Sequence, residues 1–138
     1  MTAEAVVDTS VLLDAIVEQT QRHSQAREQL AGLTKIRVPS VVLYELVWVL
    51  HRLGVPPEAV RSAVEALLQN SKVTVASDDG RFTVRAIGRI VDEKLKLSDF
   101  DDKVVLETAL KERLPLITYD KELEREARKA EIEARRRA

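Results

Sequence analysis

The chain has 138 residues, of which 45% are apolar and 33% are charged. This composition suffices for one domain with a buried core. The near balance of 22 basic and 23 acidic residues excludes both charge-driven disorder and a strongly basic nucleic-acid-binding surface. Cysteine is absent and only two histidines are present, which excludes disulfides and thiol catalysis and leaves little for a zinc site. Any metal is therefore expected to be a hard cation bound by oxygen atoms.

The sequence contains no apolar run long enough to span a membrane. Its first residues lack the basic start of a signal peptide. We therefore expect a cytoplasmic protein that has no membrane partner.

Short β-branched segments alternate with longer segments of helical periodicity. Strands are predicted over residues 3–7, 35–39, 72–76 and 115–118. Helices are predicted over residues 21–33, 41–53, 57–69, 81–97 and 98–113, with two more that begin near Val11 and at Asp120. From Ile132 the chain either forms a fifth strand or continues the last helix. Alternation of this kind predicts an α/β fold with a parallel sheet.

Acidic residues follow the first and the fourth predicted strands. Asp8 stands where the first strand becomes a helix, and Asp120 comes just after the fourth strand. Because ligands bind beyond the carboxyl ends of parallel strands, both residues are candidates for a functional site at one edge of the sheet. The structural alternative for each is to cap the helix that follows, although Ser10 could cap the first helix instead.

Glu45 lies in the most apolar helical stretch of the chain. A helix that is apolar on nearly all sides is expected to be buried on nearly all sides. A buried carboxylate is costly unless it is paired, held by hydrogen bonds or placed in a water-filled cleft. We therefore expect Glu45 to belong to a functional cleft, with a buried salt bridge to Arg37 or Arg52 as the structural alternative.

Three further acids, Asp99, Asp101 and Asp102, begin the helix predicted from residue 98. Acids in a first helical turn are stabilised by the helix dipole, and the segment from Ser98 to Asp101 resembles a capping box. Asp102 shares a helix face with Val105, and this face must meet the core. We therefore expect Asp102 to point towards the strand ends, with Asp99 one turn before it on a similar side.

Four carboxylates from four segments would thus meet at one rim of the sheet, namely those of Asp8, Glu45, Asp102 and Asp120. They would repel one another strongly unless a cation lay between them. Carboxylates and water are the usual ligands of Mg²⁺, which can polarise a phosphoryl oxygen and lower the pKa of bound water. The pattern predicts metal-dependent phosphodiester hydrolysis, with Asp8 and Asp102 as metal ligands and the other two acids completing the pocket.

Each acid stands within a short motif. The motifs are VVDTSVLL at residues 6–13, VPSVVLYEL at 38–46, LSDFDDKVVLETA at 97–109 and LITYDKEL at 116–123. Their order and spacing resemble the PIN-domain ribonucleases over nearly the whole chain. The resemblance is greatest to the VapC type, the toxins of bacterial and archaeal toxin–antitoxin pairs.

The resemblance implies a single PIN-like domain over residues 1–138. It implies a three-layer sandwich in which a parallel sheet of four or five strands carries helices on both faces. It also implies that the four acids bind Mg²⁺ or Mn²⁺ and that the protein is an endoribonuclease, with an RNA substrate, an antitoxin partner and a homodimeric assembly. Asp102 matches the family's third acid, and the neighbouring Asp99 and Asp101 are additional to its pattern.

Other residues have weaker functional interpretations. Arg81, Arg85 and Arg89 recur every four residues along one predicted helix. They could contact RNA phosphates or form a solvated helix face. Ser10 and Thr118 could orient water or a metal-bound carboxylate, or they could be cap and turn residues.

Two other functions are compatible with these residues. A phospho-accepting receiver domain also has an acidic Mg²⁺ pocket on a doubly wound sheet, and Asp8, Asp78 and Thr118 would form its site. That interpretation leaves Glu45 and Asp102 without a role. A non-catalytic RNA- or protein-binding module would use the acids for structure alone.

Overall fold

The structure, a computed structural model, describes residues 3–130 and 134–135. In this part of the chain five parallel strands form one sheet in the order β3-β2-β1-β4-β5. The strands are β1 (Glu4–Val7), β2 (Lys35–Pro39), β3 (Val73–Ala76), β4 (Leu116–Ile117) and β5 (Ala134–Arg135). The predicted α/β class and parallel sheet are confirmed. The fifth strand left open by the sequence is present, although Ile132 lies outside the described residues.

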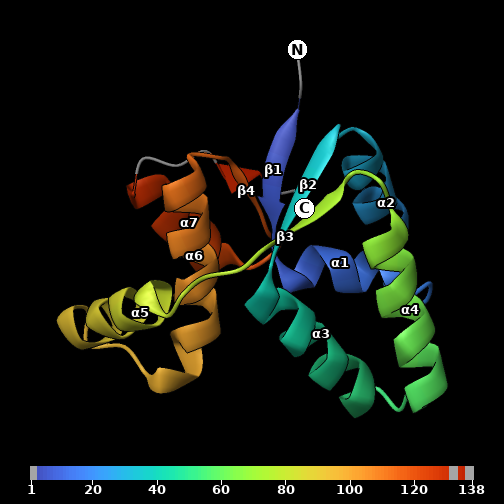
Figure 1. Ribbon diagram of the computed structural model, residues 1–138, viewed down its shortest axis with the longest axis horizontal. Helices are drawn as coiled ribbons and strands as arrows, with labels where there is room; N and C mark the ends of the chain where they lie inside the picture. Colours follow the sequence, from blue (N-terminus) through green and yellow to red (C-terminus); the bar gives the residue numbers. More distant parts are fainter. Residues whose placement is uncertain (1–2, 131–133, 136–138) are drawn as a thin grey trace.

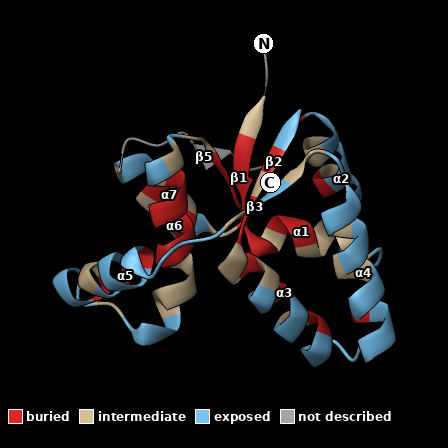
Figure 2. Ribbon diagram, in the orientation of Figure 1, coloured by how far each residue is buried: buried red, intermediate tan, exposed pale blue. Residues whose placement is uncertain are grey.

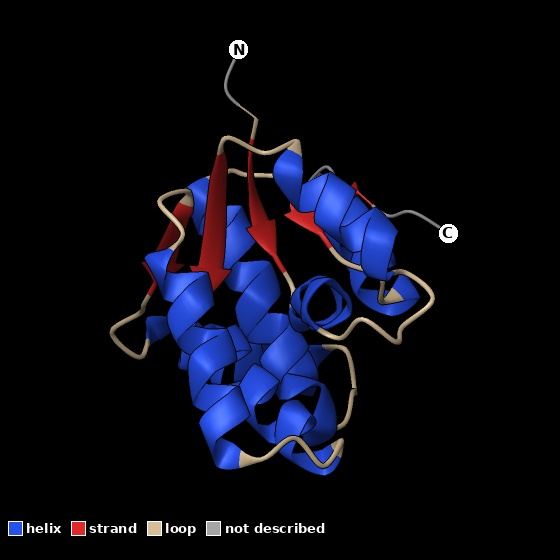
Figure 3. Cartoon of the chain, turned by 90° about the vertical axis from the view of Figure 1, so that its right-hand side faces the viewer, coloured by secondary structure: helices blue, strands red, loops and turns tan. Residues whose placement is uncertain are grey.

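Helices cover both faces of the sheet, which confirms the three-layer arrangement. On one side lie α1 (Thr9–Ile16), α2 (His23–Ala31) and α4 (Pro57–Gln69), and on the other lie α5 (Arg81–Asp92), α6 (Phe100–Glu112) and α7 (Lys121–Lys129) (Figure 1). Helix α3 (Ser40–Arg52) extends from the carboxyl end of β2. Figure 3 shows the strands pointing towards the helices that start beyond their carboxyl ends.

The buried core lies on both faces of the central strand. Ala5, Val6 and Val7 of β1 are fully buried. The main cluster of buried side chains extends from β1 to Val105 on α6 and Leu12 on α1. Figure 2 shows buried residues concentrated on β1, α1 and α6, whereas α4 is mostly exposed. Burial on both faces explains why three consecutive residues of β1, Ala5 to Val7, are apolar.

The strand order places the carboxyl ends of β1 and β4 side by side. The chain winds one way from β1 through β2 to β3, and it then returns to the other side of β1 to form β4. This change of direction makes the β1–β4 boundary the topological switch point of the sheet, where α/β folds bind ligands. The backbone N–H of Asp8 donates to the carbonyl of Ile117 at 3.0 Å, so Asp8 is held at this boundary.

Helix α3 is not buried on all sides, so that prediction is wrong. Val42, Leu46 and Leu50 are buried, but Tyr44 and Trp48 are 67% and 63% exposed. The helix packs on α1, α4 and α6, and the face that carries Tyr44 and Trp48 is exposed. The apolar sequence of α3 therefore predicted more burial than the structure shows.

Two other local predictions also differ from the structure. The helix predicted over residues 81–97 ends at Asp92, because Lys94 adopts a left-handed conformation with φ of 56°. Helix α6 begins at Phe100 after a 3₁₀ turn, η1 (Leu97–Asp99). Asp99 occupies the N-cap position without a side-chain capping bond, so the expected capping box is absent.

Candidate active site

The side chain of Asp8 lies at the switch point between β1 and β4 and is 4% exposed. Asp8 occupies the N-cap position of α1, but its side chain makes no capping hydrogen bond. Its Oδ2 accepts hydrogen bonds from Thr118 Oγ1 at 2.8 Å and from Ser10 Oγ at 3.2 Å. Burial raises the pKa of Asp8, the two hydroxyl donors offset part of this effect, and the charge of Asp120 raises it further.

Ser10 and Thr118 connect Asp8 to the end of β4. Besides donating to Asp8, Ser10 Oγ accepts a hydrogen bond from the backbone N–H of Tyr119 at 3.0 Å. Thr118 Oγ1 likewise accepts from the backbone N–H of Asp120 at 3.0 Å. The start of α1 and the end of β4 are thereby fastened together, and the two hydroxyls orient the carboxylate of Asp8.

Asp102, in the first turn of α6, is influenced by three of the other acids. Burial is the largest cause of its raised pKa, and the charges of Asp8, Asp120 and Glu45 add to it. Together they raise the pKa of Asp102 from 3.8 to about 8. Such a shift is typical of carboxyl groups gathered at one partly buried site, which is called the crevice from here on. The structure thus brings together the four acids that the sequence singled out.

Glu45 approaches the same crevice from α3 and is partly buried. Burial raises its pKa, and the carboxyl groups of Asp101 and Asp8 raise it further. Arg37, one of the two candidate partners for a salt bridge, pairs instead with Glu4 at 3.1 Å. The charged groups that act on Glu45 are therefore acids. Asp101, which we expected in a capping box, is an additional acid of this site that the sequence analysis did not place there.

Asp120 combines a structural role with a place in the acid cluster. Its Oδ1 accepts hydrogen bonds from the backbone N–H groups of Glu122 at 2.9 Å and Leu123 at 3.2 Å, so Asp120 caps α7 as the structural alternative predicted. Its charge also raises the pKa values of Asp8 and Asp102. Both capping bonds use one oxygen, so the cap does not engage Oδ2.

The structure gives less support to the remaining acids named from the sequence. Asp99 is not among the charges that act on Asp8, Glu45 or Asp102. Asp78 is exposed, and its Oδ1 accepts a hydrogen bond from the backbone of Gly80 at 2.5 Å. Because Asp78 follows the edge strand β3, with β2 between it and β1, the structure offers no support for the receiver-like site.

The three arginines on α5 are in different situations. Arg81 and Arg85 are exposed, and Arg81 forms an exposed ion pair with Asp79 at 3.3 Å. Arg89 Nε donates to Oε1 of the buried Glu107 at 2.5 Å. Arg89 is therefore engaged within the fold, and Arg81 and Arg85 are the two that face solvent.

The donor set of the acid cluster fits a hard divalent cation. Its members offer carboxylate oxygens, and a cation would relieve the repulsion that raises the pKa values of Asp8, Glu45 and Asp102. In the part of the chain that the structure describes, no three acidic or histidine side chains already form a group that could hold an ion. Binding of an ion would therefore require the acidic side chains to turn towards it.

The fold and the crevice define an α/β domain with carboxylates gathered at the switch point of a parallel sheet. The family model of the PIN domain matches residues 5–129, so the chain belongs to the PIN-domain family. No curated protein matches the chain.

Solved structures share this fold at low sequence identity. VapC20 of Mycobacterium tuberculosis, described as a sarcin-ricin loop cleaving toxin, has a TM-score of 0.78 and 19% identity over 88% of this chain and 94% of that one. VapBC2 of Rickettsia felis, bound to a promoter DNA fragment, has a TM-score of 0.70 and 16% identity over 98% and 99% of the two chains. VapBC-5 of M. tuberculosis has a TM-score of 0.60 and 18% identity over 98% of this chain and 99% of that one.

Across the described residues, no helix has the length and apolar character needed to cross a membrane.

We expect the free energy of unfolding of the metal-free protein to fall as pH rises from about 4 to about 8. In this window folded Asp102, with a pKa of about 8, keeps a proton that it loses in the unfolded chain, where its pKa is 3.8. The native state then binds more protons than the unfolded state, so raising the pH costs stability. The raised pKa values of Asp8 and Glu45 act in the same direction. Urea unfolding in the presence of a chelator measures this slope.

Asp102→Asn is the variant that isolates the effect. It removes a proton-binding group and a repelling charge, so it should stabilise the metal-free protein at the upper end of the range and flatten the slope. Asp99→Asn removes a charge that does not act on Asp8, Glu45 or Asp102, so it is the matched control and should keep the wild-type slope. Equal slopes for Asp102→Asn and wild type would contradict this account of the crevice.

Proposed function

We propose that the protein is an endoribonuclease that depends on Mg²⁺ or Mn²⁺ and acts as the toxin of a toxin–antitoxin pair. The observation that carries the proposal is the convergence of Asp8, Glu45, Asp102 and Asp120 at the switch point, where burial and mutual repulsion raise the pKa values of the first three. Membership of the PIN-domain family and a fold shared with VapC toxins support the same activity.

In this proposal Asp8 and Asp102 hold the metal ion, and Glu45 and Asp120 complete the pocket. The ion, when bound, supplies charge that polarises the phosphodiester and lowers the pKa of water. Thr118 and Ser10 keep Asp8 oriented and favour its ionised form through their hydrogen bonds to Oδ2. A carboxylate with a raised pKa is a better proton acceptor near neutral pH, which suits Glu45 to take a proton from the attacking water.

Asp8→Asn and Asp102→Asn test the enzymatic part of the proposal. Each keeps the shape of the side chain and removes one charged ligand, so each should lower RNA cleavage in Mn²⁺ by about a hundredfold or more. Asp99→Asn should cleave RNA like the wild type, because the charge of Asp99 does not act on Asp8, Glu45 or Asp102. Cleavage rates are compared on one structured RNA, with circular dichroism as the check on folding. Near-normal cleavage by either amide variant in the cluster would overturn the assignment.

The exposed arginines of α5 are the proposed RNA-binding residues. Helix α5 packs through Phe82 and Ala86 against Val104 of α6, the helix that carries Asp102. Cations on α5 can therefore lie close to an RNA strand that enters the crevice. Arg89 is the weakest of the three candidates because it pairs with Glu107.

A double variant of Arg81 and Arg85 to Gln should weaken RNA binding and reduce its salt dependence. Each lost phosphate contact should lower the slope of log affinity against log salt by about 0.7 for a single strand. Arg52→Gln with Arg61→Gln, on α3 and α4, removes the same charge elsewhere and is the control. RNA binding is measured by fluorescence anisotropy at several salt concentrations. An unchanged slope for the α5 variant would show that these arginines only form a solvated helix face.

We further infer that an antitoxin and a second copy of the chain cover different apolar surfaces. A groove of about 520 Å³ between α3 and α4 is lined by Val47, Trp48 and Val64 among others. Exposed apolar patches of this kind mark protein-binding sites, and we assign this groove to an apolar segment of the antitoxin. The exposed Val84 and Val91 of α5 form the surface assigned to the homodimer.

Two substitutions at exposed residues, one on each surface, test the two assignments separately. Trp48→Asp should reduce capture of the co-expressed antitoxin and leave the oligomeric state unchanged, because it places a charge in the groove alone. Val84→Asp should lower the molar mass measured by light scattering and keep antitoxin capture. If Trp48→Asp captures the antitoxin as well as the wild type does, the groove is not its binding site.

A further inference from the structure

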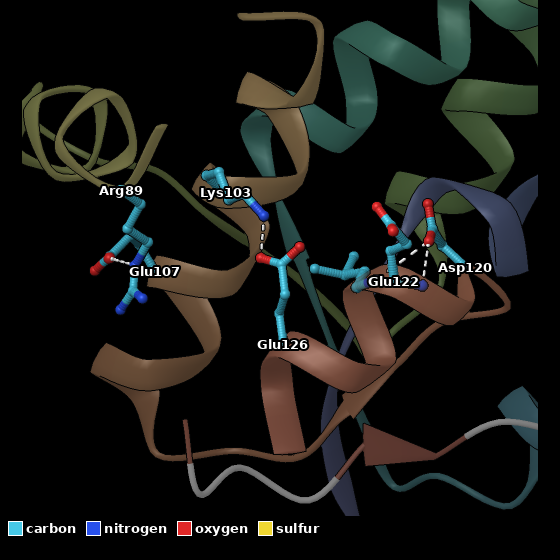
Figure 4. Close-up of polar contacts among 7 residues, drawn as sticks. Arg89, Lys103, Glu107, Asp120, Glu122 and Glu126 are labelled. Carbon is cyan, nitrogen blue, oxygen red and sulfur yellow. Dashed lines mark hydrogen bonds and ion pairs between the residues drawn. The ribbon is translucent and has the colours of Figure 1, made fainter. Parts of the chain in front are cut away.

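Helix α6 carries two buried side chains of opposite charge that pair with different neighbouring helices. Lys103 and Glu107 are one turn apart and are 1% and 6% exposed. Lys103 Nζ pairs with Glu126 Oε2 on α7, whereas Glu107 pairs with Arg89 on α5 (Figure 4). Each ion pair therefore fastens α6 to the helix on one of its two sides. In the sequence Lys103 stands between Asp102 and the apolar residues Val104, Val105 and Leu106.

Stability alone does not account for these buried ion pairs. Replacing a buried ion pair with apolar groups of similar volume is often neutral or stabilising, because desolvation offsets the attraction between the charges. An intact pair does constrain geometry, since separating its partners leaves an uncompensated buried charge. The pair between Lys103 and Glu126 thus limits how α7 can move relative to α6.

These two helices carry two acids of the crevice. Asp102 directly precedes Lys103 on α6, and Asp120 caps the helix that contains Glu126. Because the cap ties Asp120 to the first turn of α7 through Oδ1, a shift of α7 would carry Asp120 with it. Figure 4 shows Lys103 directed across the gap to Glu126, with Asp120 at the start of the same helix.

We propose that Lys103 and Glu126 are positioning residues that set the spacing between Asp102 and Asp120 for a divalent cation. The inference rests on the proposed function, because it takes these acids as parts of a metal site. The ion pair between Arg89 and Glu107 provides an internal comparison. It lies on the same helix and likewise joins one buried to one partly exposed side chain, but it fastens α6 to α5, which carries no acid of the cluster.

The test is a double variant, Lys103→Met with Glu126→Gln, studied in the full chain. It removes one positive and one negative charge, so the net charge of the region is unchanged. Because the Lys103 charge also lowers the pKa of Asp102, the effect of position is separated from that of charge by Glu126→Asp, which keeps both charges. Mn²⁺ binding to the protein alone is measured by calorimetry well below the melting temperature. We expect the affinity to fall by about tenfold or more, as for other groups that orient metal ligands. RNA cleavage should fall with it.

The matched control is Arg89→Met with Glu107→Gln, which should bind Mn²⁺ like the wild type even if its melting temperature falls. Wild-type affinity in the Lys103–Glu126 double variant would overturn the positioning role and leave the nuclease proposal standing. An equal loss in both double variants would also overturn it, because general loosening of α6 would then explain the result. Absence of Mn²⁺ binding to the wild type would instead remove the proposed function and this inference together.

A milder pair of variants covers the case in which the double variant does not fold. Glu126→Asp keeps both charges but shortens the reach from α7, so α7 should shift relative to α6 and Mn²⁺ affinity should fall. Glu107→Asp makes the same change on the side of α5 and should leave the affinity unchanged. Equal affinities for Glu126→Asp and wild type would count against the inference.

Discussion

Repulsion among carboxylates gathered at one end of the sheet is the constraint on which the rest of the structure depends. Burial first, and then the charges of Asp8, Asp120 and Glu45, raise the pKa of Asp102 to about 8. Such a cluster persists only where the surrounding structure holds it in place. The buried residues Ala5, Val6 and Val7 of β1 and the hydrogen bonds from Ser10 and Thr118 do this for Asp8.

The other three acids are held in place by different parts of the structure. Asp120 is held in place because its side chain caps α7. One carboxyl group therefore both caps the helix and belongs to the acid cluster. Asp102 is held by α6, which is buried over most of its length and paired by charge to α5 and α7. Glu45 comes from α3, whose outer side chains remain exposed. The crevice therefore combines a rigid side formed by β1, β4 and α6 with a less enclosed side formed by α3.

Sequence periodicity did not predict which face of a helix is buried where two of its faces are apolar. On α5, Val84, Ile87 and Val91 share one face with helical periodicity, but the structure buries Phe82 and Ile90 instead. Periodicity shows that a helix has a face but does not show which face meets a neighbour. The same reasoning applies to α3, where Trp48 is exposed although its neighbours in sequence are apolar. The number of neighbouring elements decides burial, and it follows from the topology.

The sequence by itself determined the alternation of strands and helices, the strand ends at which Asp8 and Asp120 stand, and the acids Glu45 and Asp102. These follow from local rules, because strand ends, helix periods and the cost of burying a carboxylate can all be read from neighbouring residues. Only the tertiary structure decided that Asp101 lies beside Glu45 and that Arg89 pairs with Glu107. It also revealed that Lys103 reaches Glu126 on another helix. Contacts between residues far apart in the chain depend on how helices pack across a sheet, and no short-range pattern encodes that packing.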